Sequence, residues 1–279
     1  MARIETILYT TDLSTESMLA FDHARLLAER FGARLTLYHA LVPHYQAYVG
    51  LGIEGDRIAA DVAEKEAWAR LTPLAEKLQT PHEIVVERDL AVPALADLVV
   101  LRRIESTQPD ITVMATHSRK GVASYFVGTV AEQVVRAAHH PVLLVRKGPR
   151  DAAAPYRRIV VTTDLSTASR SAFPWSRLLA AQFSAELIAH HVAEGPAGDT
   201  KSKVEELRRF VAPDHEGVAV RPVVSHGRAW KEIVSLATSV EADLVVMATR
   251  GHDSVGDDLL GSTADRVLRY ASCPVLIVG

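Results

Sequence analysis

The chain carries one stretch of sequence twice. Residues 7–17 read Ile-Leu-Tyr-Thr-Thr-Asp-Leu-Ser-Thr-Glu-Ser, and residues 159–169 read Ile-Val-Val-Thr-Thr-Asp-Leu-Ser-Thr-Ala-Ser. A second match lies near the end of each half, where residues 113–116 and 128–129 recur at 246–249 and 261–262. A repeat of this length is a whole domain rather than one unit of a solenoid.

The two copies differ in the length of their middle. Asp12 lies 152 residues before Asp164, but Gly128 lies 133 residues before Gly261, so the first copy carries 19 additional residues. We expect one domain at 1–147 and another at 157–279, joined by an alanine- and proline-containing linker at 148–156. Two domains of about 140 residues are also what the length of the chain predicts.

Each copy predicts five strands that alternate with helices. The repeated stretch is an apolar, β-branched run that ends in residues typical of helix caps. Continuous apolar runs such as 111–115 and 244–248 are typical of strands covered on both faces of a parallel sheet. The pattern predicts an α/β fold with two tandem doubly wound, five-stranded parallel-sheet domains.

Most of the additional residues of the first copy lie between His39 and Ile84. Residues 43–55 are rich in aromatic residues and glycine, and residues 56–78 predict a long charged helix. The segment is either a longer second helix or a lid or partner contact, and the sequence leaves both interpretations open.

The composition excludes several classes of function. The formal net charge is −3, so the basic surface that a nucleic-acid-binding protein needs is not expected. No stretch approaches the roughly 20 apolar residues of a membrane-spanning helix. The single cysteine, Cys273, cannot form a disulfide within the chain. We therefore expect a cytoplasmic protein without nucleic-acid or membrane partners.

Ligands of an open parallel sheet bind beyond the carboxyl ends of its strands. In the second copy, mostly small, hydroxyl or charged residues follow these ends. They are Thr162, Thr163, Asp164, Val192, Gly227, Ala248, Thr249, Arg250, Gly251, Gly261, Ser262 and Thr263. Glycine lets the backbone approach a ligand, and hydroxyls and amides at a helix N-terminus suit an anion. Asp164 is suited to accept hydrogen bonds from an exocyclic amine or from ribose hydroxyls. The glycine spacing alone is equally consistent with a tight strand-to-helix loop.

Taken together, these motifs resemble the universal stress protein family over both halves of the chain. The resemblance rests on Thr-Thr-Asp-Leu-Ser, His-Val at 191–192, the glycine spacing and Cys-Pro-Val-Leu-Ile-Val at 273–278. It implies a Rossmann-like, adenine nucleotide alpha-hydrolase-like fold and a loop of the pattern Gly-x2-Gly-x9-Gly-Ser/Thr for phosphate and ribose. It also implies an Asp near the adenine and a Val beneath it. Asp164, Val192, Gly251, Gly261 and Ser262 match these positions; Ala248 replaces the first glycine, and Thr162 replaces a frequent proline.

The first copy fits this pattern less well. It keeps the acid, but small or polar residues replace two loop glycines and the valine beneath the base. The corresponding weaker site consists of Asp12, Ala40, Ser118, Gly128 and Thr129. Alternatively, Arg119 and Lys120 of the same loop reach the phosphates directly.

No motif predicts a metal site or a catalytic centre. The histidines lack the spacing of a zinc site, and side chains of adjacent histidines diverge on a strand. Asp253, Asp257 and Asp258 beside the loop either help to hold Mg²⁺ or simply favour a helix start. We expect no dedicated enzyme and at most a slow ATPase, since no general base or lysine clamp is evident.

The resemblance implies a stress-response protein that binds ATP, ADP or AMP, with or without Mg²⁺, mainly in the second domain. The alternative is a nucleotide-free interaction protein, or a binder of a different small molecule, with vestigial nucleotide sites. The family commonly dimerises through its last strand, so we expect an intramolecular pseudo-dimer with antiparallel pairing of 142–145 and 275–278. A further homodimer of two chains is expected as well.

Overall fold

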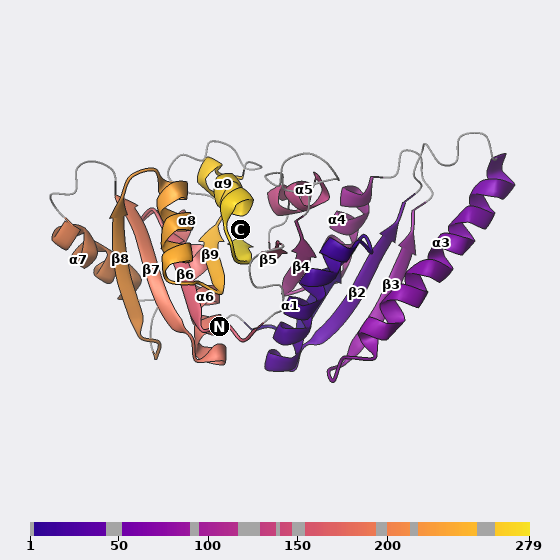
Figure 1. The fold of residues 1–279 in the computed structure, drawn as a ribbon, viewed down its shortest axis with the longest axis horizontal. Helices are drawn as coiled ribbons and strands as arrows, with labels where there is room; N and C mark the ends of the chain where they lie inside the picture. Colours follow the sequence, from indigo (N-terminus) through magenta and orange to yellow (C-terminus); the bar gives the residue numbers. More distant parts are fainter. Residues whose placement is uncertain are drawn as a thin grey trace.

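The computed structural model describes residues 3–42, 52–89, 95–116, 129–137, 140–146, 154–193, 200–212, 217–249 and 260–279. Within these ranges, ten strands form one sheet in the order β3-β2-β1-β4-β5-β10-β9-β6-β7-β8 (Figure 1). Strands within each half run parallel, and the two halves meet at an antiparallel pair. The strands are β1 (Thr6–Thr10), β2 (Arg34–Leu41), β3 (His82–Arg88), β4 (Ile111–Ala115), β5 (Val142–Val145), β6 (Arg158–Thr163), β7 (Glu186–Ala193), β8 (Val220–His226), β9 (Leu244–Ala248) and β10 (Val275–Val278).

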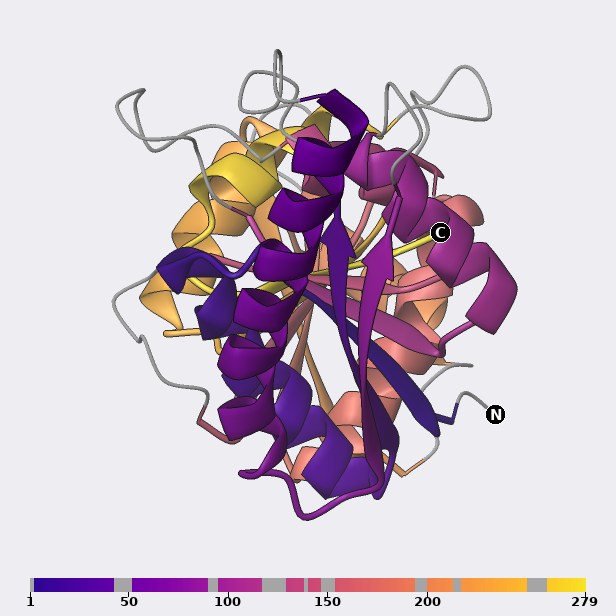
Figure 2. The same ribbon diagram turned by 90° about the vertical axis from the view of Figure 1, so that its right-hand side faces the viewer.

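Helices cover both faces of this sheet, as Figure 2 shows for the half that contains β1–β5. One face packs against α1 (Thr15–Phe31), α3 (Gly52–Ala75), the short 3-10 helix η1 (Ala168–Ser171), α6 (Ala172–Phe183) and α7 (Thr200–Val211). The other face packs against α4 (Ala96–Thr107), α5 (Thr129–Ala137), α8 (Ala229–Ser239) and α9 (Ser262–Tyr270). Burial on both faces explains the continuous apolar runs of the strands. The predicted α/β fold with two doubly wound parallel sheets is confirmed.

The additional residues of the first copy lengthen one helix. α3 contains 24 residues, whereas its counterpart α7 contains 12. The prediction of a helix at 56–78 was wrong at both ends, because α3 begins at Gly52 and ends at Ala75. Residues 43–51, the greater part of the aromatic, glycine-rich segment, lie outside the described residues.

The two halves are joined by the last strand of each copy. β5 and β10 pair antiparallel through Val142 and Ile277, Leu143 and Leu276, and Leu144 and Val275. All six side chains are buried. The predicted edge pairing is thereby confirmed, and neither strand leaves an exposed edge at the centre of the molecule.

A second contact between the halves lies between α1 and α6. The Nδ1 atom of His23 shares a hydrogen bond of 3.1 Å with the hydroxyl of Tyr156, and the ring of Tyr156 packs 4.9 Å from that of Phe183. Arg30 donates from Nε to the carbonyl of Gln182, whose side-chain amide donates to the carbonyl of Arg30. Tyr156 and His23 are buried, so the ring part of this contact belongs to the core, whereas the bonds between Arg30 and Gln182 are exposed.

The buried histidines predict a fall in stability on acidification. Burial lowers the pKa of His23 to about 4, and burial with the neighbouring His191 charge lowers that of His190 to about 4. Both titrate near 6.5 in the unfolded chain, which therefore binds more protons between these values. The contribution of these histidines to the free energy of unfolding should be complete above pH 6.5. It should decrease as the pH falls towards 4, by roughly 3 kcal/mol per histidine.

Urea denaturation of the wild type and of the double variant His23→Phe/Tyr156→Phe, between pH 7 and pH 4.5, measures this effect. The double variant removes both partners, so no polar group is left buried without one. Its free energy of unfolding should depend less steeply on pH, with the remaining slope including the share of His190. Equal slopes for the two proteins would contradict the assignment to His23.

Candidate functional site

The loop after β6 turns sharply at Asp164. Leu165 adopts a left-handed conformation with φ +66°. Its N–H donates to Thr163 Oγ1 at 2.9 Å, and the N–H of Ser166 donates to Asp164 Oδ1 at 2.9 Å. Local bonds of this type hold a short polar side chain in a turn. They fix the carboxylate of Asp164 at the carboxyl edge of the sheet.

A buried network of hydroxyl groups supports this turn from behind. Ser169 Oγ donates its one proton to the carbonyl of Ser166 at 2.8 Å. In the 2.7 Å bond between the hydroxyls of Thr163 and Ser169, Thr163 Oγ1 is therefore the donor. His191 at the end of β7 donates from Nδ1 to the carbonyl of Thr163 at 3.0 Å. The network leaves the turn little freedom to move.

Neighbouring strands complete the edge. Val192 is half-buried against the α8 side of the sheet, on the same face as His190, whereas His191 points to the opposite face. Gly227 follows β8 with φ +145°, and a Cβ atom there would lie 2.8 Å from Glu232 Oε1. Glycine at this position therefore permits a conformation that other residues rarely adopt and lets the side chain of Glu232 pack close to the backbone.

The fourth component is the N-terminus of α9. The N–H of Thr249, directly after β9, donates to the carbonyl of Val278 at 2.8 Å, and the N–H of Gly261 donates to the carbonyl of Thr249 at 3.0 Å. α9 begins at Ser262, and Gly261 is its cap residue. Glycine provides no capping side chain, so the amides of the first turn and the positive end of the helix dipole suit an anion.

These components lie together at one edge of the second half. β6 pairs with both β7 and β9, so the carboxyl ends of the three strands are neighbours, and this edge lies at the top of the view in Figure 1. The edge brings together Thr162, Thr163, Asp164, Val192, Ala248 and Thr249, with Gly227 after β8 and Gly261, Ser262 and Thr263 at α9. Arg250 and Gly251, which the sequence analysis also assigned to the site, lie outside the described residues.

The first half builds the same turn. Leu13 has φ +65°, the N–H of Ser14 donates to Asp12 Oδ1 at 3.0 Å, and Thr11 Oγ1 lies 2.7 Å from Ser17 Oγ. His39 donates from Nδ1 to the carbonyl of Thr11 at 2.8 Å. His39 and His191 thus make the same bond at the ends of β2 and β7. The repeated Thr-Thr-Asp-Leu-Ser stretch is thus explained by the fold of each half.

The two halves differ at the neighbouring positions. Ala40 takes the place of Val192, and Asp89, which forms an ion pair with Arg102, takes the place of Gly227. The other residues of the predicted weaker site, Ser118 and Gly128, lie outside the described residues, as does the side chain of Thr129.

Sequence reasoning missed the supporting role of Ser166 and Ser169. Their recurrence as Ser14 and Ser17 in the other copy was the available signal. Within the described ranges, no group of three or more His, Cys, Asp and Glu side chains could hold a metal ion. Asp253, Asp257 and Asp258 lie outside those ranges. No helix of the described part is long and apolar enough to cross a membrane.

Comparisons with known proteins agree on one family. The sequence model of the universal stress protein family matches residues 3–146 and 155–279. A universal stress protein of Methanocaldococcus jannaschii is 32% identical over 139 residues, which cover 44% of this chain and 82% of that protein. One of Mycobacterium tuberculosis is 27% identical over 242 residues, 80% of this chain and 76% of that protein. The crystal structure of a universal stress protein from Archaeoglobus fulgidus has the same fold, with a TM-score of 0.76 at 18% identity over 98% of this chain and 97% of that chain.

The supporting hydroxyl network can be tested in both halves. Ser169→Ala and Ser17→Ala each remove a buried hydrogen-bonding hydroxyl, and each should lower the free energy of unfolding by about 1–2 kcal/mol. Urea denaturation followed by far-ultraviolet circular dichroism measures the loss. If Ser169→Ala is as stable as the wild type, the turn that carries Asp164 is not held by this network.

Proposed function

Because the chain belongs to the universal stress protein family over both of its halves, we propose that it binds ATP, ADP or AMP and acts as a nucleotide-dependent sensor in a stress response. Binding takes place mainly in the second domain, which we delimit at 157–279, with 148–156 as the linker to a first domain at 1–147. The observation that carries this proposal is the N-terminus of α9, capped only by glycine, at the same sheet edge as Asp164.

Each part of a nucleotide has a counterpart at this edge. The backbone amides of Ser262 and Thr263 and their hydroxyls would bind phosphate oxygens at the positive end of α9. Asp164 would accept hydrogen bonds from the ribose or from the adenine amine, and Val192 would pack against the base. Ala248 places a methyl group where the family pattern has its first glycine, which is the smallest side-chain change.

Hydrolysis of a bound nucleotide would be slow. Among the described residues of the edge, His191 already donates from Nδ1 to the carbonyl of Thr163, and the carboxylate of Asp164 accepts an N–H. His191 is buried on the face of the sheet opposite Val192, away from the proposed base, so it is not placed to activate water as phosphoryl transfer to water requires. A divalent ion such as Mg²⁺ would enter with the nucleotide and compensate phosphate charge.

A nucleotide-free interaction protein is the second candidate. The apolar side chains of Ile58, Val62 and Trp68 on α3 are 58%, 51% and 41% exposed, which is unusual for a helix without a partner. A surface of this kind would also suit the association of two chains. On this reading, the nucleotide edge would be a remnant of the family fold.

The two carboxylates provide a matched test of the first candidate. Asp164→Asn keeps Oδ1 as acceptor for the N–H of Ser166, so the turn should persist while a charged acceptor is lost. A hydrogen bond to a charged group contributes about 1.5–3 kcal/mol, so affinity for Mg·ATP should fall roughly tenfold or more. Asp12→Asn makes the same change in the first domain and should leave the affinity nearly unchanged. Isothermal titration calorimetry measures both.

The outcomes separate the candidates. An equal loss of affinity in both variants would mean that the two domains bind alike, and no loss in Asp164→Asn would place the nucleotide elsewhere. A wild-type protein that ignores Mg·ATP would favour the interaction protein.

Gly261 tests the phosphate end. A Cβ atom at this position would lie 3.2 Å from the carbonyl oxygen of Thr249, and a larger side chain would also occupy the approach to the first turn of α9. Gly261→Val should therefore abolish measurable binding of Mg·ATP in the same titration, whereas Gly128→Val in the first domain is the matched control. Affinity that survives Gly261→Val undiminished would show that the loop assignment is wrong.

A further inference from the structure

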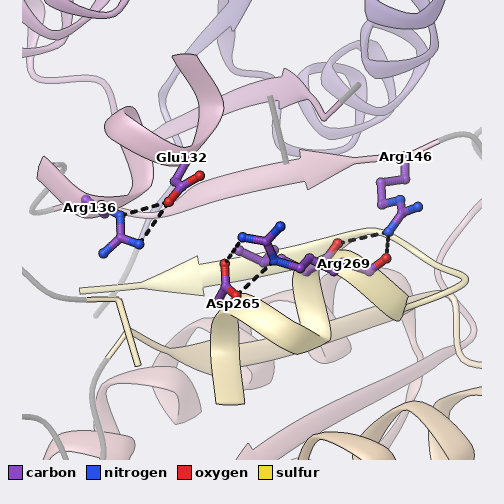
Figure 3. Close-up of polar contacts among 6 residues, drawn as sticks. Glu132, Arg136, Arg146, Asp265 and Arg269 are labelled. Carbon is purple, nitrogen blue, oxygen red and sulfur yellow. Dashed lines mark hydrogen bonds and ion pairs between the residues drawn. The ribbon is translucent and has the colours of Figure 1, made fainter. Parts of the chain in front are cut away.

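The C-terminal end of α9 is held by a residue of the first domain. Arg146, directly after β5, donates from Nη1 to the carbonyl of Leu268 at 3.3 Å and to the carbonyl of Arg269 (Figure 3). These contacts join residues 122 and 123 positions apart in the chain. Arg146 is partly buried.

The carbonyls that Arg146 binds belong to the last turn of α9. The N–H of Ala271 closes the last turn by donating to the carbonyl of Val267 at 2.8 Å, and α9 ends at Tyr270. The carbonyls of Leu268 and Arg269 therefore lie among the last four of the helix, which are bound by groups from outside it. A cation at this end also stabilises the helix dipole. Such help matters for a helix of nine residues, because helices of that length are marginal on their own.

The second domain offers no matching side chain to α5 at the corresponding position. Val145 and Val278 end the two paired strands, and the residue that follows Val278 is Gly279, which has no side chain to donate. The two helices are otherwise alike at this surface. Glu132 pairs with Arg136 at 2.9 Å in α5, and Asp265 pairs with Arg269 at 2.8 Å in α9 (Figure 3). The contact therefore acts on α9, the helix that follows the better-preserved nucleotide loop.

We propose that Arg146 is a positioning residue through which the first domain sets the nucleotide affinity of the second. This inference rests on the proposed function. The N-terminus of α9 carries the amides that would bind phosphate, and its C-terminus is bound to Arg146. A nine-residue helix spans only about 14 Å, so fixing one end orients the amides at the other. Amides that are oriented before the nucleotide arrives lose less freedom when it binds.

The same link operates in the opposite direction. A phosphate that orders α9 strengthens the bonds to Arg146, because coupling between two sites is reciprocal. Within the first domain, Val145 precedes Arg146 and accepts a hydrogen bond of 2.8 Å from the N–H of Thr116, which follows β4. The effect of nucleotide binding in the second domain is therefore transmitted to the carboxyl edge of the first domain through α9, Arg146 and Val145.

Hydrogen exchange and calorimetry on the full chain test this inference. In Arg146→Ala without nucleotide, amides of α9 should exchange about fivefold faster, while those of β5 and β10 are unchanged. The dissociation constant for Mg·ATP should rise by about fivefold as well. Arg146→Lys should restore part of both effects, since an ammonium can donate to one carbonyl. Arg136→Ala is the matched control, because Arg136 pairs within α5, and it should change neither quantity.

Binding of Mg·ATP should also slow the exchange of the Thr116 amide in the wild type and should fail to do so in Arg146→Ala. Unchanged exchange of α9 in Arg146→Ala would overturn the inference. So would faster exchange with an unchanged dissociation constant, because Arg146 would then have a structural role alone. A wild type that binds no Mg·ATP would contradict the proposed function and the coupling with it. The exchange of α9 would still decide whether Arg146 holds the helix.

Discussion

The antiparallel pairing of β5 with β10 is the contact on which the rest of the structure depends. It joins two open five-stranded sheets into one sheet of ten strands and buries an apolar edge of each. An unpaired apolar edge of this kind is a template for aggregation, so pairing within one chain removes a liability from both halves. The same pairing brings α1 close to α6 and places Arg146 within reach of α9. These contacts between the halves therefore depend on the short pairing of β5 with β10.

The turn after the first strand of each half is a requirement of the fold, which must be distinguished from the requirements of ligand binding. Asp12 and Asp164 each accept a hydrogen bond from the backbone N–H of the serine two residues further on, at 3.0 and 2.9 Å. Since both halves build this turn alike, the carboxylate alone does not distinguish a binding domain from a structural one. The differences lie at the neighbouring strands, where Gly227 lets the side chain of Glu232 pack close to the backbone and Asp89 forms an ion pair with Arg102. Any difference in ligand binding between the domains must arise there or in the loops after β4 and β9.

Features that depend on short stretches of sequence could be predicted. The strands, and the position of Asp164 and Val192 at their carboxyl ends, follow from residues adjacent in the chain. The start of α3 at Gly52 could not be predicted, because glycine is a poor helix former. The contact of Arg146 with α9 was also missed, because no local pattern encodes a bond between residues more than 120 positions apart. Similarly, the bond between His23 and Tyr156 joins residues 133 positions apart.

The stoichiometry of bound nucleotide tests the central claim most directly. Native mass spectrometry of the full chain with added Mg·ATP, followed by identification of the nucleotide after denaturation, counts the occupied sites. The account predicts one adenine nucleotide per chain, held by the second domain. Two nucleotides per chain would contradict the difference between the domains. A chain that stays empty would contradict nucleotide binding itself.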